Sequence, residues 1–166
     1  MINACRLVVA TALVTGVAAG AVQAQVELDR ILARVGARVI TKSDVQQAQQ
    51  LRLVDDVSSE AAVQRCLEER WLVLEEVRRG APLSPGSEND LAARRADWER
   101  RVGGKAAATA LLEKASMSEA ALLAWLRDDL RVEAYLARQF ATVPAADRPK
   151  ASADWLDRLR QRSKAR

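Results

Sequence analysis

Residues 118–140 constrain the fold more than any other part of the sequence, because their apolar side chains recur at helical spacing on two sides. One row is formed by Leu122, Leu126 and Leu130, and the other by Trp125, Val132, Leu136 and Phe140. A surface helix needs a single apolar stripe, whereas a helix that is apolar on two sides must be covered on both. We therefore predict a mainly α-helical domain in which this segment is the central helix.

Five shorter segments with helical periodicity complete the predicted set. They are residues 42–53, 60–79, 87–102, 105–114 and 151–163. Gly80 with the two prolines that follow it ends the second of these segments, and paired glycines end the third. The expected organisation is a helical domain at residues 25–143, a linker at 144–150 and a C-terminal helix at 151–166 that packs back onto the domain.

A short β-hairpin is predicted in front of the helices, within residues 28–40. Two apolar, partly β-branched runs flank Gly36, which can adopt the positive φ that a tight turn needs. An isolated hairpin is marginally stable in water, so it must dock on the helices. Thr41 and Asp44 have the spacing of a capping box, which predicts that the first helix begins directly after the hairpin.

The four tryptophans fall one in each of the larger predicted helices, at positions 71, 98, 125 and 155. Their even spacing suggests an internal repeat, but the flanking residues differ too much to support one. We interpret them as four separate anchors of the core, since burial of one large apolar side chain contributes roughly 1.5–3 kcal/mol or more.

The first 24 residues have the layout of a secretory signal peptide. Arg6 precedes an uncharged stretch, and the small residues Val22 and Ala24 suit cleavage before Gln25. The alternative is a retained membrane anchor, because the uncharged run from Leu7 to Val26 is long enough to span a bilayer. The expected location is therefore the periplasm, or the inner membrane if the segment is retained.

The residue types exclude several kinds of chemistry. The sequence has no histidine, so neither a Ser-His-Asp nor a Cys-His mechanism can be built. After signal cleavage Cys66 stands alone; it is either a reactive thiol or a small, buried apolar residue, and we favour the second interpretation. The carboxylate pairs at 68–69 and 75–76 alternate with arginines, which favours a solvated, salt-bridged face over a metal or acid–base site. We expect no cofactor, no metal and no catalytic residue.

The order of these features resembles the N-terminal chaperone module of the SurA family of periplasmic chaperones. The resemblance is carried by Val-Ile-Thr-Lys-Ser-Asp-Val at residues 39–45, at the end of the hairpin, and by the helix order that follows. Residues 151–161, Ala-Ser-Ala-Asp-Trp-Leu-Asp-Arg-Leu-Arg-Gln, resemble the helix that folds back to complete that module. The similarity covers most of residues 26–162.

The resemblance implies an ATP-independent holdase that binds unfolded or outer-membrane-bound polypeptides. Full-length family members insert a parvulin-type prolyl isomerase domain before the last helix, but here only residues 142–150 separate the last two helices. We therefore expect no isomerase activity. Two alternatives stay open: a member of the peptidyl-prolyl cis-trans isomerase family that acts as a noncatalytic partner, and a structural envelope protein anchored by its N-terminus. Besides unfolded polypeptides, the candidate partners are a separate parvulin and an outer-membrane assembly factor.

Two groups of residues are candidates for contact with a partner. Trp98, Val102 and Leu91 are candidates for an apolar client groove, because their segment has the sparsest apolar face; the alternative is core packing. The C-terminal segment carries net positive charge, which suits an acidic partner or, if the signal is retained, a membrane surface. Its candidate contact residues are Arg158, Arg160, Arg162 and Lys164; the alternative, which we favour, is a docked helix whose outer face is solvated. We expect no nucleic-acid partner, because an exported protein seldom meets one.

Overall fold

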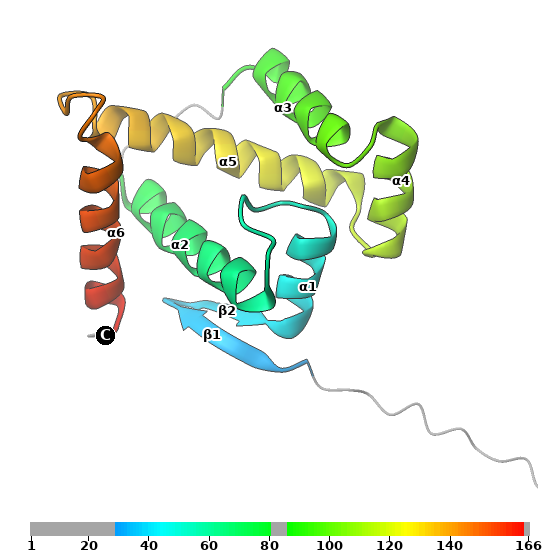
Figure 1. Ribbon diagram of the computed structural model, residues 1–166, viewed down its shortest axis with the longest axis horizontal. Helices are drawn as coiled ribbons and strands as arrows, with labels where there is room; N and C mark the ends of the chain where they lie inside the picture. The colour runs from blue at the N-terminus through cyan, green and yellow to red at the C-terminus, as the bar shows by residue number, and fades with distance from the viewer. Residues whose placement is uncertain (1–28, 81–85, 165–166) are drawn as a thin grey trace, which may run out of the picture.

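The computed structural model describes residues 29–80 and 86–164, and the predicted signal peptide lies outside these residues. The described chain forms a two-stranded antiparallel sheet followed by six α-helices (Figure 1). The mainly helical fold with a small N-terminal hairpin is therefore confirmed.

The hairpin consists of β1 (Ile31–Val35) and β2 (Arg38–Thr41). Gly36 turns the chain with a φ of +57°, as predicted for a tight turn. Val35 of β1 and Ile40 of β2 are buried in the core. The sheet is thus held on the helices by one face, as the instability of a lone hairpin requires.

Helix α1 (Lys42–Gln50) begins with the predicted capping box, in which Thr41 and Asp44 bond reciprocally to each other's backbone N–H. The helix ends about three residues before the predicted boundary. Arg52 adopts a φ of +49°, and the N–H of Leu53 donates to the carbonyl of Ala48 at 3.0 Å. This is the bonding pattern of a Schellman motif, with arginine where glycine is usual.

Helix α2 (Glu60–Arg79) has the predicted bounds, with Ser59 as N-cap and Gly80 as C-cap. Helix α3 (Glu88–Arg101) also begins with a capping box. Two glycines with positive φ, Gly103 and Gly104, separate it from α4 (Lys105–Lys114). These boundaries agree with the sequence to within one or two residues.

Helix α5 (Glu119–Gln139) is the central helix. It packs against α2 on one side and α3 on the other, and Figure 1 shows it running through the middle of the molecule with helices on both sides. Leu122 and Leu126 are buried in the core. The two apolar rows of the sequence therefore have the two sets of neighbours that they require.

Helix α6 (Arg148–Lys164) packs back on α2. It begins three residues before the predicted start, because Pro149 lies in its first turn, where the missing N–H costs no helical hydrogen bond. Part of the predicted linker at 144–150 is therefore helical. Trp155 and Leu159 are buried and anchor the helix, and the Trp155 ring packs edge-on against Phe140 at 6.0 Å between centroids.

Candidate functional site

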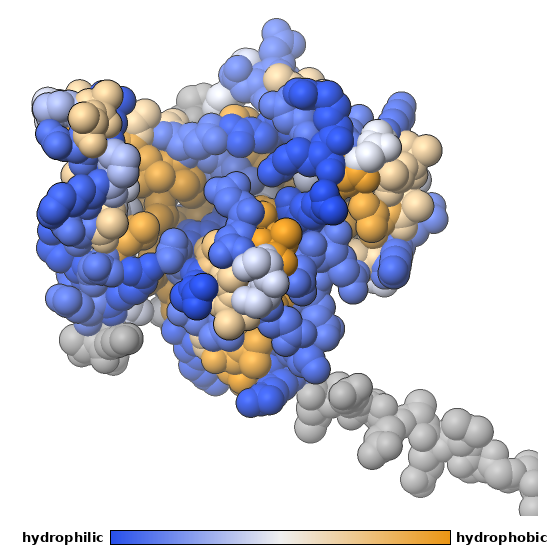
Figure 2. Space-filling view, viewed as in Figure 1, coloured by the Kyte–Doolittle hydropathy of each residue, from blue (hydrophilic) through white to orange (hydrophobic). Residues whose placement is uncertain are grey.

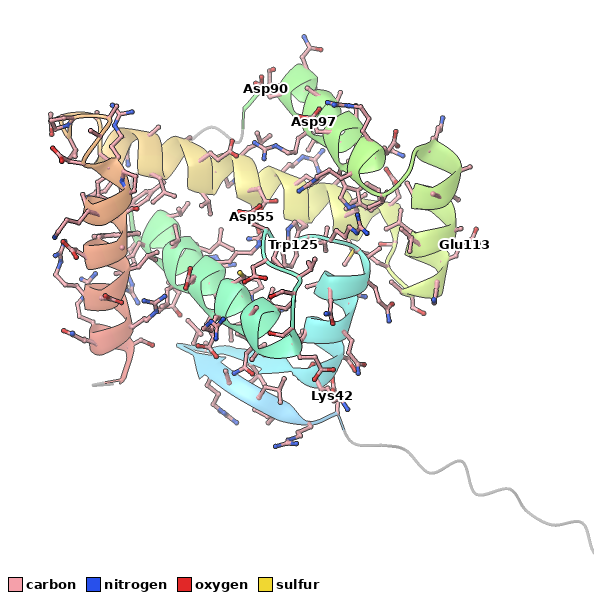
Figure 3. The ribbon with its side chains drawn as sticks, in the orientation of Figure 1. Lys42, Asp55, Asp90, Asp97, Glu113 and Trp125 are labelled. Carbon is pink, nitrogen blue, oxygen red and sulfur yellow. The ribbon has the colours of Figure 1, made fainter. Side chains whose placement is uncertain are left out.

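Two clefts flank one arginine of α2. The first, which we call the tryptophan cleft, lies between the hairpin and α1 on one side and the α2–α5 pair on the other, and has a volume of about 280 Å³. The residues that define it are Arg38, Arg70, Trp71, Met117 and Trp125. Figure 3 shows Trp125 on the side of α5 that faces α1 and α2.

The second cleft, which we call the charged cleft, has a volume of about 350 Å³. Its defining residues are Cys66, Arg70, Arg94, Asp129 and Glu133, with apolar side chains of α2, α5 and α6 beside them. Figure 2 shows apolar surface in the hollow bounded by these three helices. Both clefts are thus partly apolar and partly charged, and Arg70 belongs to the wall of each.

Arg70 is held by three groups of α5. Its side chain is only 9% exposed. Nη2 donates to the carbonyl oxygen of Trp125 at 3.0 Å and lies 3.0 Å from Oδ1 of Asp129. The guanidinium carbon also lies 3.9 Å from the centroid of the Trp125 ring, which is a cation–π contact. Burial lowers the pKa of Arg70, but an arginine stays charged in proteins, so the wall holds a permanent cation.

Two residues that line the tryptophan cleft have buried hydrogen-bond donors without a partner among the described residues. Nε and Nη1 of Arg70 and Nε1 of Trp125 are buried, and among the described residues they find no acceptor. Buried polar groups usually have a partner, and a missing partner costs free energy. Beside them the guanidinium of Arg38 lies 4.4 Å from the centroid of the Trp71 ring. The cleft thus combines aromatic walls with the guanidinium groups of Arg38 and Arg70.

Asp129 has a strongly perturbed carboxyl group. Burial raises its pKa to about 6, although the cations Arg70 and Arg94 act in the opposite direction. The group therefore changes charge in a pH range where an ordinary aspartate stays ionised. Its protonation removes the charge partner of Arg70 on the side of the charged cleft.

The predicted client-groove residues do not line an open groove. Trp98 is 0% exposed, and its Nε1 donates to the carbonyl oxygen of Leu51 at 2.7 Å. Leu91 is 5% exposed in the same core, and Val102 is half-buried against it. Because α3 has few apolar residues, those it has are needed to attach it to the rest of the domain. Their assignment to a groove is therefore wrong, and the alternative of core packing is correct.

The basic residues of α6 are divided between partners and solvent. Arg160 pairs with Glu69 of α2, and Arg162 lies 3.7 Å from Glu76. Arg158 is exposed, while the side chain of Lys164 lies outside the described part of the chain. Two of the four candidate contact residues therefore help to attach α6 to α2.

The other sequence interpretations concern α2. Glu69, Glu75 and Glu76 all take part in ion pairs with arginines, as expected for a salt-bridged face. Cys66 is half-buried, and burial raises the pKa of its thiol. A raised pKa leaves less of the nucleophilic thiolate, which disfavours the reactive interpretation.

Sequence reasoning missed Arg70, which it placed on the solvated face of the second helix. A signal was present, because residues 63, 67, 70, 74 and 77 continue one stripe at three- and four-residue steps. Four of these five positions are buried and apolar, and the fifth is Arg70. A charged residue inside an apolar stripe must find a partner in the fold.

No model of a known protein family, no curated protein and no solved structure matches the chain. Within residues 29–80 and 86–164, no helix is both long and apolar enough to span a bilayer. In the same residues, no cluster of three or more acidic or thiol side chains has the arrangement of a metal site.

Proposed function

We propose that the protein is an exported, ATP-independent chaperone of the SurA type, which holds unfolded or extended polypeptides by binding alone. The observation that carries the proposal is the tryptophan cleft, where Trp71, Trp125 and Met117 offer apolar and aromatic surface beside the exposed guanidinium of Arg38. An unfolded chain supplies both apolar side chains and backbone carbonyl acceptors. Burial of apolar surface then provides the affinity, and the guanidinium of Arg38 orients the bound segment.

The match between cleft and client depends on adaptable contacts. Methionine adapts to side chains of different shape, and tryptophan offers a large apolar face, which together suit a protein that binds many sequences. Only half-buried aromatic residues are available for such contacts, and Trp71 and Trp125 are half-buried, whereas Trp98 and Trp155 are committed to the core. The proposal therefore assigns client binding to two of the four tryptophans.

The test is suppression of aggregation of an unfolded outer-membrane protein by a several-fold excess of the exported form. We expect suppression by the wild-type protein and no acceleration of prolyl isomerisation in a parallel, protease-free assay. Because truncation of an interface hot spot costs about 2 kcal/mol or more, Trp71→Ala should raise the concentration for half-maximal suppression by at least about tenfold.

Ile31→Ala is the matched control, because Ile31 is an apolar side chain of β1 that is 52% exposed and lies outside the tryptophan cleft. It should leave suppression unchanged. Equal loss in both variants, or no suppression by the wild type, contradicts the proposal. N-terminal sequencing of the exported form should begin at Gln25; an intact Met1 would favour the anchored alternative.

A further inference from the structure

We propose that the tryptophan cleft selects polypeptide segments in which an acidic side chain lies next to apolar ones. The inference rests on the proposed function and adds the chemical class of client that this cleft prefers. It follows from the balance of charges and hydrogen-bond donors in the cleft wall.

The acidic groups of the cleft already have partners. Oδ2 of Asp44 accepts a hydrogen bond from the backbone N–H of Thr41 at 3.0 Å, within the capping box of α1. Oδ1 of Asp128 accepts from Arg131 at 2.8 Å. A cationic client would have to compete with these contacts, so the cleft offers it little.

The basic residues of the cleft have charge or hydrogen-bond donors without a partner among the described residues. Arg38 is exposed and, within the described part of the chain, has no ion-pair partner; its guanidinium rests on the Trp71 ring instead. Arg70 is nine-tenths buried, and two of its three nitrogens make no hydrogen bond to any described residue. Nε1 of Trp125 also makes no hydrogen bond to any described residue. Arg38 is therefore the group of the cleft that is available to an oxygen acceptor, and the positive charge of Arg70 lies behind it; a carboxylate is the strongest such acceptor.

The apolar walls and the volume of the cleft determine which side chains fit beside the carboxylate of a client. The walls contributed by Trp71, Trp125 and Met117 are apolar, and a volume of about 280 Å³ lies at the lower end of the roughly 300–1,000 Å³ typical of small-molecule sites. A space of this size takes one or two side chains of an extended segment. An acidic residue beside an aromatic or aliphatic one fits both the charge and the walls.

The test uses fluorescent peptides of ten residues with amidated C-termini, so that a side chain supplies the only carboxylate. The three probes share one apolar sequence and carry Asp, Asn or Lys at its centre. Fluorescence anisotropy with the full protein should give an affinity about tenfold higher for the Asp probe than for the Asn probe, since a hydrogen bond to a charged group contributes about 1.5–3 kcal/mol. The Lys probe should bind weakest.

Arg38→Gln should abolish the preference for Asp over Asn, and because Arg38 is exposed this substitution leaves the core intact. Arg34→Gln is the matched control, since Arg34 is an exposed cation of the same hairpin outside the cleft, and it should keep the preference. Equal binding of all three probes, or tighter binding of the Lys probe, overturns the inference but leaves the holdase proposal standing. Failure of every probe to bind contradicts both.

Discussion

Asp129 offers a test of the charged cleft that can be read from stability alone. Burial raises the pKa of its carboxyl group from 3.8 to about 6 in the folded protein. Between these two pH values the folded state holds the proton and the unfolded state releases it. Folding therefore takes up a proton in this range, and stability falls as the pH rises through it.

The magnitude follows from the size of the pKa change. At about 1.4 kcal/mol for each pH unit, a rise from 3.8 to about 6 corresponds to about 3 kcal/mol. The side chain of Asp129 is 28% exposed, so water screens part of the effect and we expect about 1–3 kcal/mol. The contribution is fully present below pH 4 and is lost above pH 6.

The perturbation is Asp129→Asn, which keeps the shape of the side chain and removes its titration. Urea unfolding at pH 4, 5, 6 and 7, followed by tryptophan fluorescence, gives the free energy of unfolding of both proteins. The advantage of the wild type over the variant should shrink by about 1–3 kcal/mol from pH 4 to pH 7. Asp128→Asn, on the same helix, controls for the loss of any carboxylate there.

A wild-type advantage that grows with pH would refute this reasoning. It would mean that the ion pair with Arg70 outweighs burial, so that the folded state prefers the ionised carboxylate. An advantage that stays constant over the range would also refute it, because it would show the same pKa in the folded and unfolded states.

Three further substitutions test the local structure by urea unfolding. Gly36→Ala should lower the free energy of unfolding by about 1–2 kcal/mol because of the positive φ. If adding Glu75→Ala to this variant restores its stability, the cause is instead the clash of the new Cβ with the Glu75 carboxylate. Trp98→Phe should cost about 1–3 kcal/mol, since it leaves the Leu51 carbonyl without its donor, and a change below about 0.5 kcal/mol would contradict the burial of that bond. Thr41→Ala should lower the free energy of unfolding by about 1 kcal/mol, whereas Thr41→Ser should leave it unchanged. Equal losses in the two variants would argue against the N-cap role of Thr41.

The parts of the fold that the sequence predicts well are those with strong local chemistry. The N-cap Ser59 and the C-cap Gly80 place α2 correctly, and Thr41 places the start of α1. The end of α1 escapes prediction because Arg52 adopts a positive φ that is usual only for glycine. The hydrogen bonds that end the helix fix the conformation of Arg52. No residue type in this part of the sequence predicts those bonds.

The site is harder to predict because it depends on contacts between helices. Sequence reasoning chose Trp98 as an exposed groove residue from the composition of one helix, but burial is decided by what that helix packs against. Trp71 and Trp125 are the same residue type as Trp98, yet they remain half-buried. The packing of α2 against α5 and of α1 against α2 separates the core tryptophans from those of the cleft.

Arg70 belongs to the candidate site and is also the residue whose burial the local sequence pattern did not predict. A leucine at this position would continue the apolar stripe of α2, and replacing a buried ion pair by apolar residues is often neutral or stabilising. The chain instead buries a cation, offsets part of its cost with Asp129 and Trp125, and leaves two nitrogens unsatisfied among the described residues. A departure from the local rules without full compensation in the fold is expected at a functional site. The proposed function accounts for this residue, because a cation in the wall shared by both clefts serves binding more than stability.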